Sequence, residues 1–547
     1  MKIVFVTIGA EYIGVELMAA MLKQAGHQVQ ALCDESVFDD KNYFTVPPLA
    51  RLFERRSQVV QEIVGANPGL VGISVITNGY PWALEIARGV KALRPDIPVI
   101  LGGVHVTSVP EHVIAQDCVD MICVGEGHHA LVELADSLEA GAGRTDIQNI
   151  WFKLDGEVIR NPQRRETENI EDLPLLDKSV YEGEVPLHLT YLALSQWGCP
   201  FACSYCAVTS LAENSKALGC KPWRMMSVDK VIAELKHYRE RYNFDSVFFM
   251  TNTFTADKNW VQEWAQKYPA AIGLPYKIAT HPTKIDLDVA KALKSSGCYT
   301  VQLGVESYSE EVRAKIYNRR ETNEQVHAAT KAMDDAGLRY TIDYILGGPL
   351  QSEQEYHDAA EFFITLKKCI RITPFIISFF PRTPLVEIAR AHGMIAASEI
   401  ERLEQGLDPN FVTSGSLSDP TVIRRLNAWR LFFRLIPILP TGLNKRILER
   451  KWFRFFEYLP TGVIVLFMDV VISFVVRDYV ALGYLRTYAW NVRKVIKRKF
   501  GRLRRNITDQ GCKGSNAPVC PPPAANTPPT EPAHGAHHQA MGPHGLQ

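Results

Sequence analysis

The sequence lacks the features of secreted and nucleic-acid-binding proteins. Its 60 basic and 60 acidic side chains cancel, so no overall field favours nucleic acid as a partner. Eleven cysteines are spread along the chain and, apart from one cluster, show no paired spacings, which argues for reduced thiols and against a disulfide framework. The first residues, MKIVFVTIGAEY, do not form a signal peptide, so we expect a cytoplasmic location.

Common nucleotide-binding signatures and long apolar runs are missing too. A Rossmann dinucleotide site requires GxGxxG after the first strand, where this chain has GAEYIG. A Walker loop with Gly-Lys-Ser/Thr is absent. The apolar stretch 462–476 contains Asp469 and is shorter than the ~20 residues that cross a bilayer. These absences argue against a nicotinamide site, a P-loop and a membrane span.

The first part of the chain alternates strand-like and helix-like segments. Residues 2–140 contain continuous apolar runs, such as KIVFVTIG and IPVILGGVH, separated by amphipathic stretches. This pattern predicts a Rossmann-like or flavodoxin-like parallel sheet covered on both faces. The runs end in small or polar residues: Gly9, Ser74 to Asn78, Gly102, Gly103, Gly125 and Gly127. Because ligands bind at the carboxyl ends of such strands, we expect a binding crevice there. The alternative is that these glycines only turn the chain.

A second alternation predicts a barrel-like α/β domain. Six strand candidates, from LTYLALSQWG to TPFIISFFPRTP, are each followed by a helix-compatible stretch. With 547 residues the chain is expected to form two to four domains. We predict a first domain at 1–142, a linker at 143–187 with a hairpin turning at Asp155-Gly156, a partial (β/α)6 barrel at 188–405, a helical basic and aromatic region at 406–508, and a disordered tail at 509–547.

The cysteine cluster lies in WGCPFACSYCAV. Cys199, Cys203 and Cys206 offer three thiolates without an obvious fourth. Structural zinc sites and ferredoxin clusters use four ligands, whereas three thiolates can hold three irons of a [4Fe-4S] cluster and leave the fourth iron open to a substrate-like ligand. The alternatives are a zinc knuckle that recruits Cys220, or three buried apolar cysteines.

This cluster resembles the CxxxCxΦC signature of the radical S-adenosylmethionine (SAM) superfamily, with Tyr205 as the aromatic residue. The resemblance implies that the open iron binds SAM, whose reductive cleavage gives a radical that removes hydrogen from substrate. It also implies the SAM-contacting residues Tyr205, Glu306, Ser307, Gly347, Gly348 and Pro349. A structural strand-end carboxylate is the alternative for Glu306. The chain has Thr251-Asn252 where relatives often carry acids, so a role for such acids is not expected here.

The first domain, with LGGVHVTSVPE and VGEGHHALVELADSL, resembles the cobalamin-binding class of the same superfamily. We therefore predict cobalamin contacts from Gly9, Ser74, Thr77, Gly102, Gly103, His105, Gly125, Glu126 and Gly127. The loop GAEYIG has no histidine, so a cobalt ligand from that loop is excluded, and cobalt ligation by His105 is disfavoured. His128 and His129 are expected to begin a helix.

The cofactors implied are a [4Fe-4S] cluster, SAM and cobalamin. The leading hypothesis is methylation of an unactivated carbon of a small, hydrophobic or lipid-like substrate, with a flavodoxin or ferredoxin as electron donor. A second hypothesis is cobalamin-assisted ring formation, oxidation or rearrangement without methyl transfer, as in anaerobic tetrapyrrole cyclases. A third, a non-catalytic cobalamin or iron–sulfur sensor, is disfavoured because a sensor does not need the three-cysteine motif.

The C-terminal part mixes aromatic, aliphatic and basic residues. Residues 421–507 include RRLNAWRLFFRLIPIL and RKVIKRKFGRLRR, which suit a membrane interface with anionic lipid. A helical cap on the catalytic domain with a solvated basic face explains the same composition. Both interpretations stay open at the level of sequence, and a lipidic substrate is expected only under the first.

Overall fold

The computed structural model describes residues 1–40, 44–407, 414–459 and 461–511. It divides into two compact units, residues 1–495 and residues 496–547. The first unit contains both predicted α/β sheets and most of the C-terminal helices. The description below concerns this unit.

The first sheet is parallel from its edge strand β2 to β7, and its last two strands are antiparallel. Its strands, in spatial order, are β2 (Gln28–Asp34), β1 (Lys2–Ile8), β5 (Leu70–Ser74), β6 (Val99–Gly102), β7 (Met121–Cys123), β8 (Ile150–Leu154) and β9 (Glu157–Arg160). The predicted sheet is thus confirmed. The hairpin expected in the linker also forms, and it extends this sheet, because β8 pairs antiparallel with β7. Asp155 and Gly156 form its turn with positive φ values of 49° and 84°.

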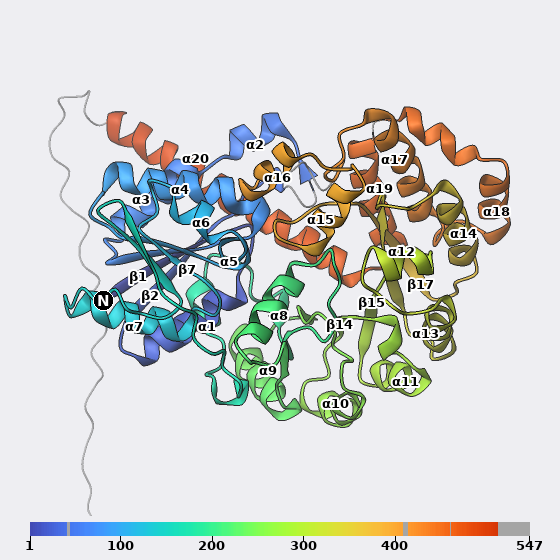
Figure 1. Cartoon of the computed structure of the whole chain (residues 1–547), viewed down its shortest axis with the longest axis horizontal. Coiled ribbons are helices and arrows are strands. Elements are labelled where there is room, and N and C mark those ends of the chain that lie inside the picture. Colours follow the sequence, from blue (N-terminus) through green and yellow to red (C-terminus); the bar gives the residue numbers. More distant parts are fainter. Residues whose placement is uncertain (41–43, 408–413, 460, 512–547) are drawn as a thin grey trace, which may run out of the picture. The chain divides into compact units, whose positions relative to one another are not determined.

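Helices cover both faces of this sheet, which explains its continuous apolar strands. One face packs against α3 (Arg56–Gly65), α4 (Tyr80–Leu93), α5 (Val104–Ser108) and α6 (Pro110–Ile114). The other packs against α1 (Ile13–Gln24) and α7 (His128–Glu139), and Figure 1 shows the two helical layers above and below the strands. Alternate residues of β1 serve the two cores, with Val4 and Val6 on the α4 side and Phe5 on the α1 side.

A buried lysine in the connector joins the two α/β parts. Lys178, in the short helix η3 (Lys178–Tyr181), is fully buried, and its Nζ lies 2.9 Å from Glu16 and 3.3 Å from Glu11 of the first domain. The same Nζ donates a hydrogen bond of 2.9 Å to the carbonyl of Leu192 in the barrel. Because an unpaired buried charge is expensive, these contacts hold α1 against the first barrel strand.

The second sheet is a six-stranded parallel partial barrel, as predicted. Its order is β10 (Thr190–Ala193), β13 (Ser246–Phe249), β14 (Tyr276–Thr280), β15 (Cys298–Glu306), β16 (Tyr340–Leu346) and β17 (Cys369–Ile376). Two strand limits differ from the sequence interpretation. LTYLALSQWG forms β10 and a separate β11 (Gln196–Gly198), which pairs antiparallel with β12 (Trp223–Met225). The last strand begins at Cys369 and ends at Ile376, because the later residues of TPFIISFFPRTP lead into the next helix.

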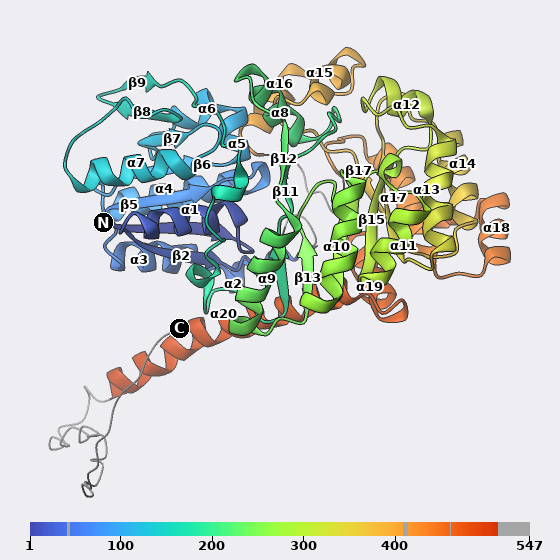
Figure 2. The ribbon, with the colours of Figure 1, turned by 90° about the horizontal axis from the view of Figure 1, so that it is seen from below.

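The barrel strands have one packed face and one accessible face. Residues that point outward, such as Leu303, Ile342 and Ile372, are completely buried in the largest apolar core. That core lies between the strands and their helices, and Figure 2 shows several of these helices beside the strands. The inward row, which includes Lys277 and Gln302, is only half-buried. The barrel helices are α8 (Ala207–Ala217), α9 (Val228–Tyr242), α10 (Lys258–Ala271), α11 (Leu287–Ser295), α12 (Glu310–Lys315), α13 (Asn323–Asp335), α14 (Glu353–Ile364) and α15 (Pro384–Ala391).

The region after the barrel is helical, as predicted. It comprises α16 (Ala397–Glu404), α17 (Pro420–Leu435), α18 (Thr441–Glu449), η5 (Trp452–Tyr458), α19 (Thr461–Val475) and α20 (Tyr479–Gly511). Trp429, Phe432 and Phe433 of α17 belong to the main barrel core, so this helix caps the catalytic domain. No helix in the described parts of the chain has the length and hydrophobicity needed to cross a bilayer. Most of the predicted tail, residues 512–547, lies outside the described residues.

The segment around the start of α20 contacts both sheets. Asp478 accepts a hydrogen bond of 3.1 Å from the Tyr299 hydroxyl and pairs with Arg371 at 3.2 Å, near the amino ends of β15 and β17. Further along, Lys494 pairs with Glu35 at 2.8 Å and with Glu184 at 2.9 Å. These ion pairs attach the C-terminal region to the barrel and to the first domain.

Candidate active site

The three clustered cysteines lie on the loop between β11 and α8. Cys206 is the residue before α8, and its amide donates a hydrogen bond of 3.1 Å to the carbonyl of Cys203. The Thr209 hydroxyl donates to the same carbonyl at 2.7 Å, and Cys199 Sγ lies 3.5 Å from Thr253 Oγ1. All three thiols are half-buried and none is in a disulfide. The loop is therefore fixed by its own backbone, and the sulfur atoms remain available to a metal.

The three thiols are spaced more widely than the ligands of a single zinc ion. Thiolates that share one zinc at about 2.3 Å lie about 4 Å from one another, whereas a cubane cluster binds each thiolate to a different iron. Among the described residues, the only group of three ligating side chains with donor atoms within 4.8 Å of one another is His357, Asp358 and Glu361. The thiols are thus more widely spaced than a zinc knuckle requires. Cys220 is buried, and its Sγ lies 3.6 Å from the carbonyl of Leu218.

A buried arginine connects the cysteine loop to the predicted SAM carboxylate. Arg319 donates a hydrogen bond of 3.1 Å to the hydroxyl of Tyr205 and one of 2.6 Å to the carbonyl of Gly304, and its Nη1 lies 3.9 Å from Glu306. Its Nε also donates to Glu321 at 2.6 Å. Burial raises the pKa of Glu306, and the guanidinium opposes that shift. Arg319 therefore orients the aromatic residue of the motif and the strand-end carboxylate together.

Glu306 has a strained backbone. Its φ of 65° is in the left-handed region, which is uncommon for a residue other than glycine, asparagine or aspartate. The strand register is irregular between Gly304 and Glu306, and a side chain at Gly304 would approach the Glu306 carboxylate. The irregularity turns this carboxylate toward the cysteine loop, and such strain is concentrated at functional sites.

The remaining predicted SAM residues are held by protein contacts. Ser307 is fully buried and donates a hydrogen bond of 2.5 Å to Glu355, so its hydroxyl is already engaged. A Cβ at Gly348 would lie 2.2 Å from the Tyr317 hydroxyl, and one at Gly347 would lie 2.7 Å from Leu426. These glycines allow the loop that ends in Pro349 to lie close to the protein. Their contact with SAM stays a prediction.

A cavity of about 390 Å³ lies where the first sheet meets the barrel. From the first domain it is lined by the predicted residues Ser74, Gly102, Gly103, Gly125, Glu126 and Gly127. Residues of α1 and α7 complete that side, namely Ile13, Gly14, Leu17, Met18 and His128. Trp197, Gly198, Met250 and Asn252 belong to the other side. The carboxyl edge of the first sheet and the loop that precedes the cysteines thus share one space.

The cavity has a polar group suited to a ligand. The indole Nε1 of Trp197 is buried, and no residue in the described parts of the chain accepts its hydrogen bond. Trp197 stacks edge-on with His128, and Arg224 lies over its ring at 5.4 Å while pairing with Glu126 at 2.6 Å. Burial lowers the pKa of His128 to about 3, so this imidazole is neutral. A neutral, largely apolar wall with one free donor fits a large ring with peripheral acceptors, such as a corrin.

Three predicted cobalamin residues do not line this cavity: Gly9, Thr77 and His105. His105 is fully buried on the opposite face of the sheet, where its ring packs 4.4 Å from that of Tyr80 and its Nδ1 lies 3.3 Å from Thr77. Burial lowers its pKa to about 4. His105 belongs to the short helix α5, which begins directly after Gly103 and directs this side chain to the face of the sheet that carries Tyr80.

Sequence reasoning missed Trp197, Arg319 and the inward polar residues of the barrel. The signal for the last group was present: PYKIATH contains Lys277 within an apolar strand, and TVQLGVES contains Gln302 in alternation with the predicted Glu306. Such alternation indicates one face that is not packed. Arg319, in YNRRETN, has no comparable local signal, because its partners lie elsewhere in the sequence.

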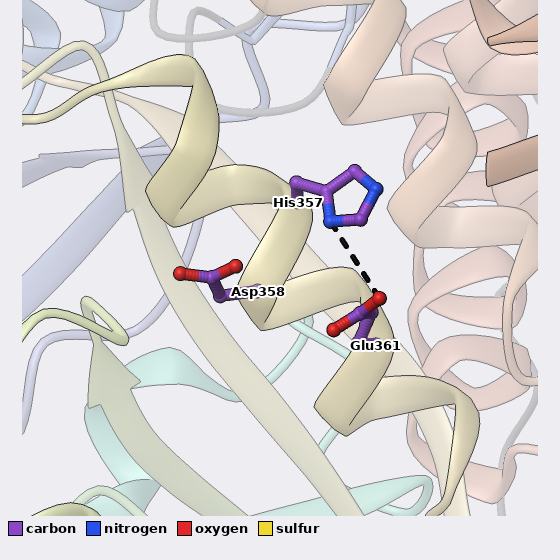
Figure 3. A group of neighbouring side chains, drawn as sticks. All are labelled: His357, Asp358 and Glu361. Atoms are coloured by element: carbon purple, nitrogen blue, oxygen red, sulfur yellow. Dashed lines mark ion pairs between the residues drawn. The ribbon is translucent and has the colours of Figure 1, made fainter. Parts of the chain in front are cut away.

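His357, Asp358 and Glu361 are separate from this site. They lie on one helix, α14, and His357 pairs with Glu361 at 3.8 Å (Figure 3). The two acids are exposed, and neighbouring groups of this kind are common on helix surfaces. They contribute nothing to the cavity described above.

Two family models match the chain. Residues 1–135 match the B12 binding domain, and residues 195–363 match the radical SAM superfamily. The two matches correspond to the first sheet and to the greater part of the barrel. They contain the glycine-rich crevice and the three cysteines, respectively.

Known proteins resemble the chain over most of its length. An uncharacterized methyltransferase of Pyrococcus horikoshii is 28% identical over 62% of this chain and 73% of its own length. An anaerobic magnesium-protoporphyrin IX monomethyl ester cyclase of Cereibacter sphaeroides is 23% identical over 82% of this chain and 74% of its own length.

Among solved structures, the cobalamin-dependent S-adenosylmethionine radical enzyme OxsB, with aqua-cobalamin and SAM bound, aligns with a TM-score of 0.61. The alignment covers 94% of this chain and 82% of that one at 13% identity, which shows a shared fold. The residues of the cysteine loop and of the crevice fit the cofactors that both family models imply. The chain therefore contains an N-terminal B12-binding domain and a radical SAM domain, and these two domains imply a [4Fe-4S] cluster, SAM and cobalamin as its cofactors.

Proposed function

We propose that the protein transfers a methyl group to an unactivated carbon of a hydrophobic small molecule. One observation carries the proposal: a single cavity joins the carboxyl edge of the B12-binding sheet to Trp197, Gly198 and Met250 of the barrel side. When bound, cluster and SAM supply a radical that removes hydrogen, and cobalamin supplies a methyl carrier. Both reactive centres would then face the same substrate across this cavity.

The chain's own residues have positioning roles in this proposal. Cys199, Cys203 and Cys206 would hold three irons, while Arg319 keeps Tyr205 and Glu306 beside them. Burial raises the pKa of Cys203 to about 11, and the positive charges of iron and of Arg319 favour its thiolate. Apolar groups such as Leu17, Met18 and Met250 line the cavity and would exclude water, which protects a reactive radical.

Incubation with SAM that carries a deuterated methyl group tests methyl transfer. The reconstituted, reduced enzyme is mixed with a small-molecule extract of its source cells, and products are analysed by mass spectrometry. We expect a product that contains the intact deuterated methyl group, together with 5′-deoxyadenosine. Formation of 5′-deoxyadenosine with a new product that lacks the label would contradict methyl transfer.

The second candidate is ring formation or oxidation without methyl transfer. It is favoured by the likeness to the Cereibacter sphaeroides cyclase, which covers 82% of this chain. The cavity alone is compatible with either outcome, because both require a substrate between the two cofactors. The isotope experiment separates the candidates, since only methyl transfer retains the label.

We also propose that α19 contacts an anionic membrane surface. This helix directs polar groups inward, where Asp469 lies 3.1 Å from Arg434 and Ser473 accepts a hydrogen bond of 2.8 Å from Arg371. Its outer face carries Phe467 and Phe474, which are 68% and 61% exposed. A short helix with exposed aromatics, followed in sequence by the basic run 493–505, suits a lipid interface.

Sedimentation with vesicles tests this contact. The wild-type protein should sediment with phosphatidylglycerol vesicles more than with phosphatidylcholine vesicles, and the double variant F467S/F474S should lose most of this binding. L154S, which changes an exposed residue of β8, is the matched control and should bind normally. Equal sedimentation of F467S/F474S and wild type would contradict the proposal.

The electron donor is proposed to be an acidic flavodoxin or ferredoxin. Asn318 donates a hydrogen bond of 2.7 Å to the carbonyl of Ala202 in the cysteine loop, and the nearby Arg320 is exposed. An exposed cation beside the cluster loop complements an acidic redox partner. R320E should slow SAM cleavage driven by such a donor but leave cleavage driven by dithionite unchanged; equal rates with the protein donor would exclude this contact.

A further inference from the structure

The side chains that face the inside of the barrel are partly exposed to solvent, and their character differs between the two ends of the strands. Toward the carboxyl ends of the strands, Met250 and Phe375 are 48% and 42% exposed although both belong to barrel strands or directly follow them. Nearer the amino ends, the inward residues include Lys277, Gln302 and Asp343, all half-buried. The outward neighbours of these residues are buried in the core. The inward face of the barrel thus carries the apolar side chains of Met250 and Phe375 toward the carboxyl ends of the strands, and the polar side chains of Lys277, Gln302 and Asp343 nearer the amino ends.

Lys277 is an inward-facing cation whose ammonium group has no ion pair among the described residues. Its Nζ lies 4.7 Å from the centroid of the Phe248 ring, and it makes no hydrogen bond or ion pair with any residue in the described ranges. Burial lowers the pKa of Lys277, while Asp343 and Asp478 act in the opposite direction from a distance. An ammonium that contacts only a ring face keeps its hydrogen-bond donors free, so an anionic ligand could accept hydrogen bonds from it.

The charged neighbours of Lys277 are already engaged. Asp343 accepts a hydrogen bond of 2.5 Å from Gln302. Arg371 lies 3.2 Å from Asp478 and 3.6 Å from Asp469, both in the C-terminal region that packs near the amino ends of the strands. Among the described residues, Arg371 is thus held by two carboxylates, whereas Lys277 has no ion pair and is available to an anionic ligand.

We propose that Lys277 binds the acidic head group of an amphiphilic substrate inside the barrel. The hydrocarbon part then lies along Phe375 and Met250, and Met250 also lines the cavity that contains the crevice glycines. This inference rests on the proposed function and narrows its substrate to a hydrocarbon with a carboxylate or phosphate group. The head group fixes the depth of the substrate, and so determines which carbon reaches the cofactors.

The register gives the approximate length of this substrate. Lys277 pairs with Thr300, and Glu306 lies six residues further along β15. At about 3.3 Å per residue, the positions of Lys277 and Glu306 are roughly 20 Å apart along the strand direction. Their separation along the barrel axis is somewhat smaller, because the strands are tilted. The reacting carbon would accordingly lie well away from the acidic group, at an unactivated position of the chain.

The test compares three probes that share one hydrocarbon: dodecanoate, dodecyl phosphate and dodecan-1-ol. Their binding to the holoenzyme, reconstituted with cluster and cobalamin, is measured by calorimetry. The wild type should bind at least one of the acids roughly tenfold more tightly than the alcohol, because a charged hydrogen bond is gained. The acid that binds more tightly identifies the head group. In K277M this preference should disappear, and K277R should keep most of it.

Two controls separate this inference from simple misfolding and from the proposed function. K291M removes an exposed lysine of α11 and should retain the preference for the acids. Reductive SAM cleavage without substrate should be equal in K277M and wild type, because Lys277 lies far below the cysteine loop. The inference is overturned if the wild type binds neither acid more tightly than the alcohol, or if K277M keeps the preference. Loss of SAM cleavage in the wild type would instead refute the proposed function.

Discussion

The two parallel sheets of this protein use their surfaces in different ways. The first sheet is covered by helices on both faces, so Val4, Phe5 and Val6 are all buried and only the strand ends can meet a ligand. The barrel is covered on its outer face alone, so Ile372 is buried while Phe375 of the same strand is 42% exposed. A sheet that curves into a barrel leaves its inner face free to contact a ligand. A sheet that is covered on both faces can contact a ligand only at the ends of its strands. In this protein the edge of one sheet adjoins the mouth of the other.

The largest expected effect concerns the cysteine loop between β11 and α8, which belongs to neither sheet. C203A should lose most of its iron after anaerobic reconstitution, and reductive SAM cleavage should fall to the background of cluster-free protein, since two thiolates hold the cluster poorly. Iron and sulfide analysis with quantification of 5′-deoxyadenosine checks this. C220A is the control and should keep both properties. Loss of metal from C220A as well would show that Cys220 is a ligand, as the zinc-knuckle alternative requires.

The next effect separates the two faces of the barrel. I372A removes a fully buried outward side chain, so the free energy of unfolding should fall by about 2–5 kcal/mol. F375A removes an accessible inward side chain of the same strand and should lower it by about 1 kcal/mol or less, while product formation is impaired. Chemical denaturation of both variants measures the difference. Similar losses of stability would mean that the lumen is packed and not open.

A smaller effect tests the edge of the first sheet. Gly103 has a φ of 102°, and a Cβ there would lie 2.7 Å from the carbonyl oxygen of Val75. G103A should therefore distort the crevice and weaken cobalamin binding by roughly ten- to a hundredfold, which corresponds to about 1–3 kcal/mol of strain. Absorbance titration with hydroxocobalamin measures the affinity.

The control for this variant is G141A. Gly141 also has a positive φ, of 61°, but no atom lies within 4 Å of its hypothetical Cβ. G141A should bind cobalamin as tightly as the wild type, and both variants should cleave SAM normally. An unchanged affinity in G103A would remove Gly103 from the cobalamin site.

The smallest effect concerns an acid in the lumen. Burial raises the pKa of Asp343 to about 6, whereas its ordinary value is about 4. Between these values the native protein binds the proton more tightly than the unfolded chain, so stability falls as pH rises through this range. Relative to D343N, the wild type should lose about 1–2 kcal/mol between pH 4 and pH 7 and little above that. Denaturation at several pH values checks this, and a parallel profile in both proteins would show that Asp343 titrates normally.

Much of the fold could be predicted because strand and helix periodicity is local. The runs KIVFVTIG and LVGISVIT became β1 and β5, and the six barrel strands formed in the predicted order. The strand limits were less certain: LTYLALSQWG was divided, since β11 pairs with the distant β12. The hairpin at 150–160 was expected from its Asp-Gly turn, but its attachment to β7 depends on a pairing that no local pattern encodes.

The candidate site was predicted in part. The three cysteines are adjacent in sequence, so their motif was readable, and six of the crevice residues followed from strand ends. The position of His105 outside the cavity could not be foreseen, because the side of the sheet to which it points depends on how α5 begins after Gly103. Arg319 was missed because its hydrogen bonds to Tyr205 and Gly304 join segments that are far apart in the chain.

The sequence by itself determined the chemistry: a three-thiolate loop, a glycine-rich strand edge and two α/β domains, all set by patterns within short segments. Only the tertiary structure decided how these are combined, because burial, ion pairs and strand register depend on residues brought together from distant segments. It placed the crevice against Trp197, linked Arg319 to Glu306, and left Lys277 beside the Phe248 ring without an ion pair among the described residues. It also divided the C-terminal region between a cap, α17, and a helix with an exposed apolar face, α19, since packing decides which side of an apolar helix is buried.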